Sequence, residues 1–439
     1  MRYEKRQIFE HGVSVDAESG SLCTKAGYAV NAIPVRIAAG SRIKPLDKTL
    51  KYRCFYYKPE IADKLIYTYA YQPDANWTTY IPEKTEDILS AGSRSVAEEC
   101  FIRVTVREND IDTDSTFDDV FCIENGESQR NIPGWMTAEA ESVCARAEAV
   151  RRDGDAVFLL LTDPHYSTGC IWDDTVLSMK IVSSKLVPDG IICLGDLTDG
   201  MLSLRHTKGI TEDILKDLRQ VCGSLYLCLG NHDLNYFRGN PNRMTRQMGA
   251  RLILGEDQLW YFRDIPDRKL RMIFLDSFDP ERKERYGFDD HEIVWLRKVL
   301  RKTPRGYKIL VFSHITPLPE NHVWSIDILN SSRAMRALEN FNKKKKNSVI
   351  GWIYGHNHAD QMIGYRDFPL ISIGCSKLEA FNEHKPEDAV TYTRKKGTRT
   401  QELWDILMVH NEGSMDLIRF GAGKDRCTSK GDIYNDQSE

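Results

Sequence analysis

The chain has 439 residues, more than one ordinary hydrophobic core accommodates, so at least two domains are expected. Hydrophobic residues make up 41% of the chain and charged residues 28%, as in a globular protein. The net charge of −4 gives no reason to expect nucleic acid or an anionic membrane surface as a partner.

Targeting and redox signals are few. The first residues, "MRYEKRQIFEHGVSVD", contain no apolar core of a signal peptide, so a cytoplasmic location is expected. No apolar stretch reaches the ~18 residues that a membrane span needs.

The 11 cysteines form no CxxC pair, and several, such as Cys193 and Cys228, lie inside apolar runs. We therefore expect reduced, buried thiols rather than a disulfide framework.

Residues 1–128 are predicted to form a β-sandwich-like accessory domain. Runs such as "KYRCFYYK" and "CFIRVTVREND" are rich in β-branched and aromatic residues, and turn-forming clusters separate them. The stretch "VDAESGSLCTKAGYAVNAIPVRIAAGSRI" resembles β-sandwich modules that precede catalytic domains and occur in phage tail proteins. That resemblance implies a spacer, or a domain with a possible glycan or protein partner.

Residues 129–154 are predicted to be a linker and a helix. The polar stretch "ENGESQRNIPGW" contains several turn residues, and Thr137 is a candidate cap for a helix that ends before Gly154. The alternating pattern of the first domain stops here.

Residues 155–425 are predicted to form a layered α/β domain, followed by a polar tail at 426–439. Continuous apolar runs such as "AVFLLLTD", "GIICLGD" and "YKILVFSH" indicate strands buried on both faces. Amphipathic segments between them indicate helices; "DDHEIVWLRKVLRK" places Ile293, Leu296, Val299 and Leu300 on one stripe. "TQELWDILMVH" and "MDLIRF" are expected to be closing strands.

Five of the apolar runs are followed directly by residues of the types that bind metals in proteins. The segments are "LLLTDPHYS", "IICLGDLTDG", "LYLCLGNHD", "ILVFSHITP" and "WIYGHNHAD". They supply Asp163, His165, Asp196, Asp199, Asn231, His232, Asp233, His314, His356 and His358. Because sites in open α/β sheets lie beyond the carboxyl ends of the strands, we expect these side chains to converge.

The residue types indicate a pair of divalent metal ions. Carboxylate, imidazole and amide oxygen suit Mn, Fe or Zn, and the absence of cysteine argues against a structural thiolate zinc site. Asp196 is expected to bridge the ions, since it follows Gly195 at a strand end and offers two coordinating oxygens. Gly195, like Gly230 and Gly355 before the other clusters, allows the backbone to approach the centre closely.

The ordered set DxH–GDxxD–GNHD–H–GHxH resembles the calcineurin-like metallophosphoesterase superfamily. Its GDxxD and GNHD forms are most similar to the class III cyclic-nucleotide phosphodiesterases. The resemblance covers about residues 155–380 and implies a four-layer α/β/β/α fold with a dinuclear centre. It implies that Asp163, His165, Asp196 and His358 hold one metal ion. It assigns the other ion to Asp196, Asn231, His314 and His356.

The resemblance also implies a reaction, the hydrolysis of a phosphoester by a metal-bridging hydroxide. His232 is expected to stay off the metals and to protonate the leaving alkoxide as general acid. Asp233 is expected either to hydrogen-bond and orient the ring of His232 or to cap the next turn. Asp199 is either a carboxylate that supports the centre or a turn cap.

The substrate is not specified by these motifs. The leading hypothesis is a phosphodiesterase acting on a small-molecule phosphoester, and a phosphomonoesterase of the same fold is the nearest alternative. A different class is an inactive glycan-binding or scaffold protein, against which the intact ligand set argues. Arg238, Arg243, Arg246 and Trp324 lie in loops expected to determine specificity, although solvated arginines and a packing tryptophan remain the simpler interpretation.

Overall fold

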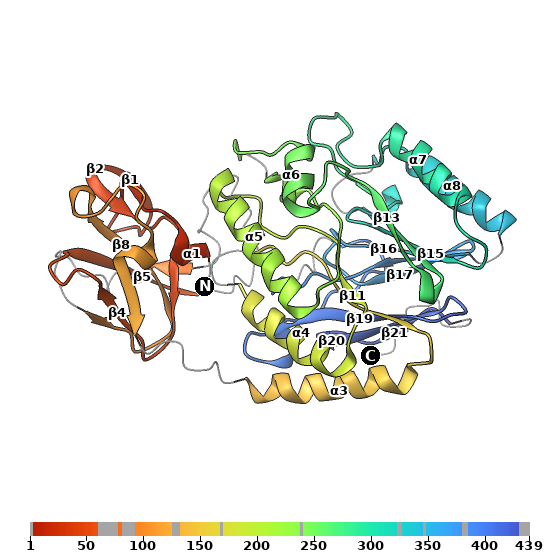
Figure 1. Cartoon of the computed structure of the whole chain (residues 1–439), viewed down its shortest axis with the longest axis horizontal. Helices are drawn as coiled ribbons and strands as arrows, with labels where there is room; N and C mark the ends of the chain where they lie inside the picture. The colour runs from red at the N-terminus through yellow and green to blue at the C-terminus, as the bar shows by residue number, and fades with distance from the viewer. Residues whose placement is uncertain are drawn as a thin grey trace. The chain divides into compact units, whose positions relative to one another are not determined.

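A computed structural model describes residues 3–59, 78–80, 93–124, 132–166, 170–237, 240–322, 327–345, 348–379 and 385–429. The chain divides into two compact units (Figure 1). One unit comprises Met1–Ile132 with Ser167–Cys170, and the other comprises Pro133–Tyr166 with Ile171–Glu439. Each unit is described by itself below.

The first unit is built from antiparallel strands. One sheet has the order β1-β2-β8-β5-β6 with β3 paired to β8, and a smaller sheet has the order β7-β4-β9. The strands are β1 (Glu10–Val15), β2 (Leu22–Val30), β3 (Val35–Ile37), β4 (Arg42–Pro45), β5 (Tyr52–Pro59), β6 (Thr78–Tyr80), β7 (Arg94–Ser95), β8 (Cys100–Arg107) and β9 (Phe121–Glu124). Short helices are α1 (Tyr3–Arg6) and α2 (Phe117–Val120). The prediction of a β domain is confirmed.

The apolar face of these strands forms a core of its own. Alternate residues of β8, Ile102, Val104 and Val106, are fully buried against Tyr52 and Phe121. Both faces of β8 are buried, and the period-two alternation separates the apolar positions that face this core from Arg103 and Thr105 on the other face.

The second unit starts with helix α3 (Gly134–Val150). The helix was expected here, but it starts earlier than the candidate cap: Pro133 occupies the cap position and Thr137 lies inside the first turns. Proline suits a helix start because its missing N–H would have had no partner there.

Two six-stranded sheets form the centre of this unit. The first has the order β12-β11-β10-β19-β20-β21 and the second β13-β14-β15-β16-β18-β17. The first contains β10 (Ala156–Leu161), β11 (Gly190–Cys193), β12 (Leu225–Leu227), β19 (Leu403–Val409), β20 (Met415–Gly421) and β21 (Arg426–Cys427). The second contains β13 (Tyr261–Ile265), β14 (Leu270–Phe274), β15 (Lys308–Ser313), β16 (Val349–Tyr354), β17 (Gln361–Tyr365) and β18 (Phe368–Ser372).

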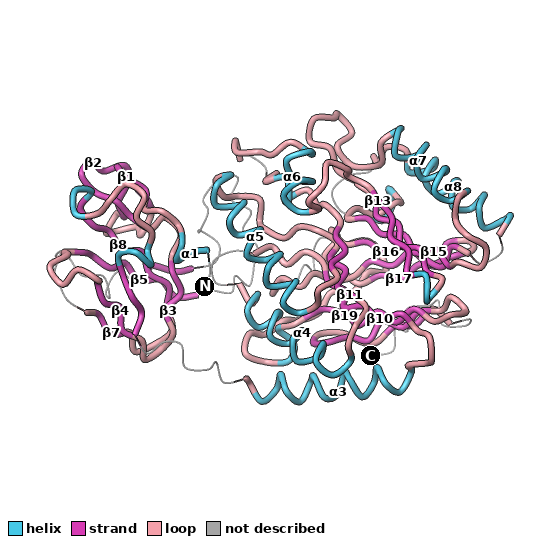
Figure 2. The backbone as a smooth tube through the Cα atoms, in the orientation of Figure 1, coloured by secondary structure: helices cyan, strands magenta, loops and turns pink. Residues whose placement is uncertain are grey.

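The sheets pack face to face between two layers of helices. Figure 1 shows α3, α4 (Trp172–Leu186) and α5 (Leu204–Val221) beside the first sheet, and α7 (Asp290–Arg301) and α8 (Ser331–Lys344) beside the second. The remaining helix is α6 (Arg246–Ile253). Phe158 and Leu160 of β10 pack with Phe274 and Phe312 of the other sheet in one buried cluster. The four-layer α/β/β/α fold is thus confirmed, and the colours of Figure 2 separate the helix and strand layers.

The helix α7 shows why the amphipathic pattern was informative. Its predicted stripe of Ile293, Leu296, Val299 and Leu300 is buried, together with residues of α8 and the second sheet. Asp289 caps the helix, and the carboxylate of Glu292 accepts a hydrogen bond from the backbone amide of Asp289. Burying one such aliphatic side chain contributes roughly 1.5–3 kcal/mol, which fixes the helix on the sheet.

Parallel pairing directs the important strand ends to the same side. β10, β11 and β12 run parallel in the first sheet, and β14, β15, β16 and β18 do so in the second.

Among the residues that the structure describes, no helix combines the length and apolarity needed to cross a membrane.

Candidate metal centre

The ten predicted site residues follow five strands. Asp163 and His165 follow β10, Asp196 and Asp199 follow β11, and the Asn231-His232-Asp233 segment follows β12. His314 comes directly after β15, whereas His356 and His358 follow β16. The packed sheets therefore bring together side chains that are up to 195 positions apart in the printed sequence.

The backbone at these turns is unusual. Asp163, His165, Asp196, His356 and His358 all have positive φ, between 40° and 66°. This left-handed conformation is disfavoured for residues with a side chain, and it clusters where the surrounding structure requires it. Within the part of the chain that the structure describes, 11 non-glycine residues have positive φ, and five of them belong to this one place, as is typical of functional sites.

The turns after β11 and β12 are in contact through two glycines. A Cβ on Gly195, whose φ is +103°, would lie 2.5 Å from the backbone nitrogen of Gly230. A Cβ on Gly230 would lie 2.1 Å from Oδ1 of Asp196. The two glycines therefore let Asp196 and Asn231 come together, as the sequence predicted.

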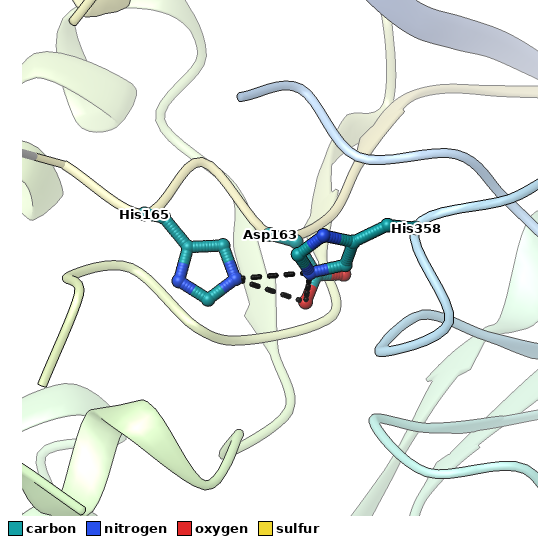
Figure 3. Close-up of side chains that lie close together, drawn as sticks. All are labelled: Asp163, His165 and His358. Carbon is teal, nitrogen blue, oxygen red and sulfur yellow. Dashed lines mark hydrogen bonds and ion pairs between the residues drawn. The ribbon is translucent and has the colours of Figure 1, made fainter. Parts of the chain in front are cut away.

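Three side chains form what we call the His165 group: Asp163, His165 and His358 (Figure 3). The Nε2 atoms of the two imidazoles are 3.1 Å apart. They lie 3.5 Å (His165) and 3.2 Å (His358) from Oδ1 of Asp163. Oδ2 of Asp196 is 3.7 Å from Nε2 of His165 and completes the set.

The remaining predicted ligands form what we call the His314 group. Nε2 of His314 lies 3.1 Å from Oδ2 of Asp196 and 3.3 Å from Oδ1 of Asn231. It is also 3.2 Å from Nδ1 of His356. Asp196 thus belongs to both groups, which is the position expected of a bridging carboxylate.

The arrangement fits cations better than it fits a set of hydrogen bonds. Asp163 and His314 are fully buried, and Oδ1 of Asp163 has no hydrogen-bond partner despite its two imidazole neighbours. Buried polar atoms normally find partners, so nitrogen and oxygen atoms that converge without bonding indicate a metal site. Carboxylate, imidazole and amide donors suit divalent first-row metals.

The outer ring nitrogens are held by different partners. Nδ1 of His314 donates to the carbonyl of Leu194 at 2.8 Å, and Nδ1 of His232 donates to the carbonyl of Asp199 at 2.5 Å. Nδ1 of His358 instead contacts the carboxylate of Glu379. Such contacts fix the tautomer and direct the other nitrogen at the centre.

Asp233 takes only one of the two roles expected for it, that of a turn residue. Its carboxylate accepts hydrogen bonds from the backbone nitrogens of Asp196 (2.8 Å), Leu197 (2.7 Å) and Gly230 (2.8 Å). The ring of His232 instead donates its hydrogen bond to the Asp199 carbonyl, so the expectation that Asp233 orients this ring is wrong. Asp233 acts as a turn clamp, because three amide donors converge on its carboxylate.

The charges of the metal-free centre shift its titration. Burial lowers the pKa of His314, but the carboxylates of Asp196 and Asp163 outweigh it and raise the pKa to about 9. Burial and the nearby Asp196 raise the pKa of Asp233 to about 7. Burial lowers the pKa of His232 to about 4, against the opposing charge of Asp196. Buried carboxylates that favour the protonated, positively charged form of a neighbouring imidazole also favour the binding of a cation.

The sequence analysis missed two charged residues at the centre, Lys377 and Glu379. They follow β18 in the segment "GCSKLE", so the rule that strand ends carry the site would have found them. Two other expectations, Arg238 and Trp324, lie outside the described residues. Arg246 is paired with Asp276 and Asp279, so it is a structural residue rather than a phosphate ligand.

The comparison with protein families decides the assignment. The sequence profile of the calcineurin-like phosphoesterases matches residues 156–360, the region that holds every residue of both groups. The chain carries a calcineurin-like phosphoesterase domain. The predicted resemblance is confirmed, and the phosphoesterase domain makes the chain a metal-dependent phosphoester hydrolase.

The chain is similar to several solved structures at low identity. A dimetal phosphatase from Danio rerio is 16% identical with a TM-score of 0.43, covering 62% of this chain and 98% of that one. The purple acid phosphatase PPD1 from Lupinus luteus is 11% identical with a TM-score of 0.43, covering 94% and 75%. These scores are too low to support an argument about mechanism. A search of curated proteins returned no match.

Proposed function

We propose that the chain is a dinuclear phosphodiesterase that hydrolyses a small-molecule phosphodiester. The observation that carries the proposal is the convergence of the His165 and His314 groups on the shared carboxylate of Asp196. Asp163, His165, His358 and Asp196 would hold one divalent ion, and Asp196, Asn231, His314 and His356 the other. The donor types favour Mn, Fe or Zn.

The metal ions would contribute a defined part of the chemistry. When bound, two divalent cations supply a polarising charge for the phosphoryl group and a nucleophilic water at neutral pH. The protein's own residues position the ions, exclude bulk water through burial and handle the leaving group. Asp163 and Asp196 contribute two negative charges, fewer than the four positive charges of two divalent ions. The loaded centre would therefore still attract an anionic diester.

His232 is proposed as the general acid. Its Nε2 lies 4.0 Å from Oδ2 of Asp196, and its side chain is 19% exposed, so it borders the centre and remains accessible to substrate. Because Nδ1 donates to the Asp199 carbonyl, the neutral ring presents a lone pair at Nε2. The ring must therefore gain a proton at Nε2 before it can protonate a leaving alkoxide.

An anionic substrate would favour that protonation. Burial keeps the pKa of His232 near 4 in the metal-free protein, so the ring is neutral at pH 7 before substrate arrives. A phosphoryl oxygen beside Nε2 would stabilise the imidazolium form, as opposite charges do at short range. A specific alternative is that Nε2 serves as a further metal ligand, because His232 also groups with His165 and Asp196.

Two aromatic residues that follow His232 in the chain, and two arginines that contact one of them, are proposed to contact the organic groups of the diester. The ring of Phe237 lies 5.8 Å from that of His232. The guanidinium groups of Arg243 and Arg285 lie 4.8 Å and 5.4 Å from the ring of Tyr236, which precedes Phe237. Such a wall suits a substrate with a planar or anionic leaving group.

A diester fits the charge of the centre better than a monoester. A monoester carries a second negative charge, which one more cation beside the two metal ions would stabilise. The amine of Lys377 lies at the centre, but it is 3.5 Å from Oδ1 of Asp199 and 3.3 Å from Oε2 of Glu379. Since two carboxylates already neutralise this lysine, it offers little attraction to a phosphomonoester.

Metal analysis followed by paired substrate turnover tests the proposal. The full chain, loaded with Mn²⁺, is assayed with bis-p-nitrophenyl phosphate and with p-nitrophenyl phosphate. Two bound ions and a higher kcat/KM for the diester are expected. A preference for the monoester would favour the phosphomonoesterase alternative. Two bound ions without hydrolysis of either ester would favour the scaffold alternative.

The domain limits and the role of the first unit are also proposals. We propose that residues 1–128 form an accessory domain that binds a glycan or a protein, and that residues 155–425 form the catalytic domain. A glycan array probed with the full chain tests the first part. Binding that survives Asp196→Asn would separate it from the phosphoesterase site.

A further inference from the structure

A carboxylate outside the predicted ligand set holds one histidine of the His165 group. Glu379 Oε1 contacts Nδ1 of His358, and the opposite ring nitrogen lies 3.2 Å from Oδ1 of Asp163. A carboxylate that accepts the Nδ1–H proton fixes the tautomer and leaves the Nε2 lone pair facing the centre.

The second histidine of this group has a similar neighbour. Oδ1 of Asp199 lies 3.6 Å from Nδ1 of His165, whose Nε2 is 3.5 Å from Oδ1 of Asp163. The outer edges of both imidazoles thus face carboxylates, and the inner edges face the same oxygen atom.

One buried lysine joins the two carboxylates. Lys377 is 6% exposed, and its Nζ lies 3.5 Å from Asp199 and 3.3 Å from Glu379. Its backbone is tied to the same place, because the Lys377 amide donates to the carbonyl of Asp163 at 3.1 Å. The neighbouring Ser376 donates to the carbonyl of Thr162 through both its amide and its hydroxyl group. A lysine buried at this depth is retained when its charge is paired.

We propose that Glu379 and Lys377 are positioning residues of the metal centre. Glu379 holds His358 directly, and Lys377 clamps Glu379 and Asp199 so that both imidazoles present Nε2 to one ion. The two halves of the centre therefore differ. In the His314 group, the ring of His314 is oriented by the backbone carbonyl of Leu194, which carries no net charge and cannot be changed by substitution of a side chain.

The inference rests on the dinuclear centre of the proposed function, but its test needs no turnover. The full chain is stripped of metal and titrated with Mn²⁺, and bound ions are counted by mass spectrometry after dialysis. Wild type is expected to bind two ions. Glu379→Ala should bind one of them about 10–100-fold more weakly, the range typical for lost partners of ligating histidines. Glu379→Gln, which keeps an acceptor oxygen, should lose less.

Lys377→Met separates positioning from simple charge. If Lys377 acted only through its positive charge, its removal would strengthen cation binding. A positioning role predicts weaker binding, because the freed carboxylates repel each other and release the two rings. Tighter binding by this variant would therefore overturn the role of Lys377.

Glu292→Gln is the matched control, since Glu292 is a buried glutamate whose carboxylate accepts backbone amides of Asp276 and Asp289. It should leave the metal titration unchanged. Unaltered binding of both ions by Glu379→Ala would overturn the inference while leaving the centre intact. Absence of metal binding by wild type would overturn the centre and the inference together.

One further outcome would replace the inference. His358, Cys375 and Glu379 also lie close enough to hold an ion. Three ions in wild type, and loss of the third in Cys375→Ser, would assign Glu379 as a ligand rather than a positioning residue. Two ions in both proteins are expected.

Discussion

Gly195 and Gly230 lie so close together that a Cβ on the first would stand 2.5 Å from the backbone nitrogen of the second. This contact joins the turns that carry Asp196 and Asn231. It explains why glycine precedes these two clusters: the two turns must touch before Asp196 and Asn231 can share a metal ion.

Substitution of Gly195 should therefore damage both stability and metal binding. Gly195→Ala places a methyl group against backbone and requires a φ of +103°, so we expect a loss of roughly 2–4 kcal/mol in the free energy of unfolding. Gly223→Ala is the control, because a Cβ there meets nothing within 4 Å. Chemical denaturation with and without Mn²⁺ measures both effects; equal stability of the two variants would contradict the close-contact argument.

Removal of the shared carboxylate should abolish metal-dependent stabilisation. Wild type with Mn²⁺ at a hundred times its dissociation constant should gain about 2.7 kcal/mol per site by mass action. Asp196→Asn should lose this gain, whereas the exposed Asp267→Asn carries the same charge change and should keep it. Thermal unfolding with Mn²⁺ and with EDTA gives the comparison. A full metal-induced shift in Asp196→Asn would remove Asp196 from the centre.

The variant His232→Ala should retain both metal ions and lose rate. Loss of a general acid is expected to lower kcat about 10²–10⁴-fold, most strongly for esters with poor leaving groups. A series of diesters with leaving groups of rising pKa measures the trend. An equal loss across the series would argue against proton donation, and loss of one ion would make His232 a ligand.

Arg285 is expected to act on substrate binding. Arg285→Ala should raise KM for an anionic or planar diester about tenfold, equivalent to about 1.4 kcal/mol, and leave kcat nearly unchanged. Arg297→Ala on the exposed side of α7 is the control for loss of one positive charge. Steady-state kinetics decide the matter; an unchanged KM would show that the Arg285–Tyr236 contact is only a surface feature.

A buried glutamate away from the centre should make stability depend on pH. Burial, opposed by hydrogen bonds from Gln401 and Thr175, raises the pKa of Glu402 to about 7 from its ordinary value of 4.5. Between these values the folded chain binds a proton that the unfolded chain has released. Stability should therefore fall as pH rises from about 4.5 to 7, by up to about 3 kcal/mol.

Glu402→Gln should remove this slope. The variant should match wild type near pH 5 and exceed it near pH 8, measured by urea unfolding of metal-free protein. The exposed Glu141→Gln serves as control and should follow wild type at both pH values. A Glu402→Gln variant less stable than wild type at pH 8 would show that the carboxylate is paired as an anion.

The sequence by itself determined the layers and most of the centre. Apolar runs predict strands locally, because burial on both faces leaves no polar position in β10 and only the two end positions in β15. Residues placed just after such runs must lie at the sheet edge where parallel strands end. The identities of Asp163, His165, Asn231 and His314 therefore followed from order and residue type.

Only the tertiary structure decided what each polar atom contacts. Whether Asp233 would reach the ring of His232 or three backbone amides depends on how closely the turns after β11 and β12 approach. The contact between Glu379 and His358 joins loops that follow different strands. Whether the two side chains meet depends on the register of β16 with β18. Local patterns record burial and chain direction, whereas hydrogen-bond partners depend on ångström-scale packing between segments distant in sequence.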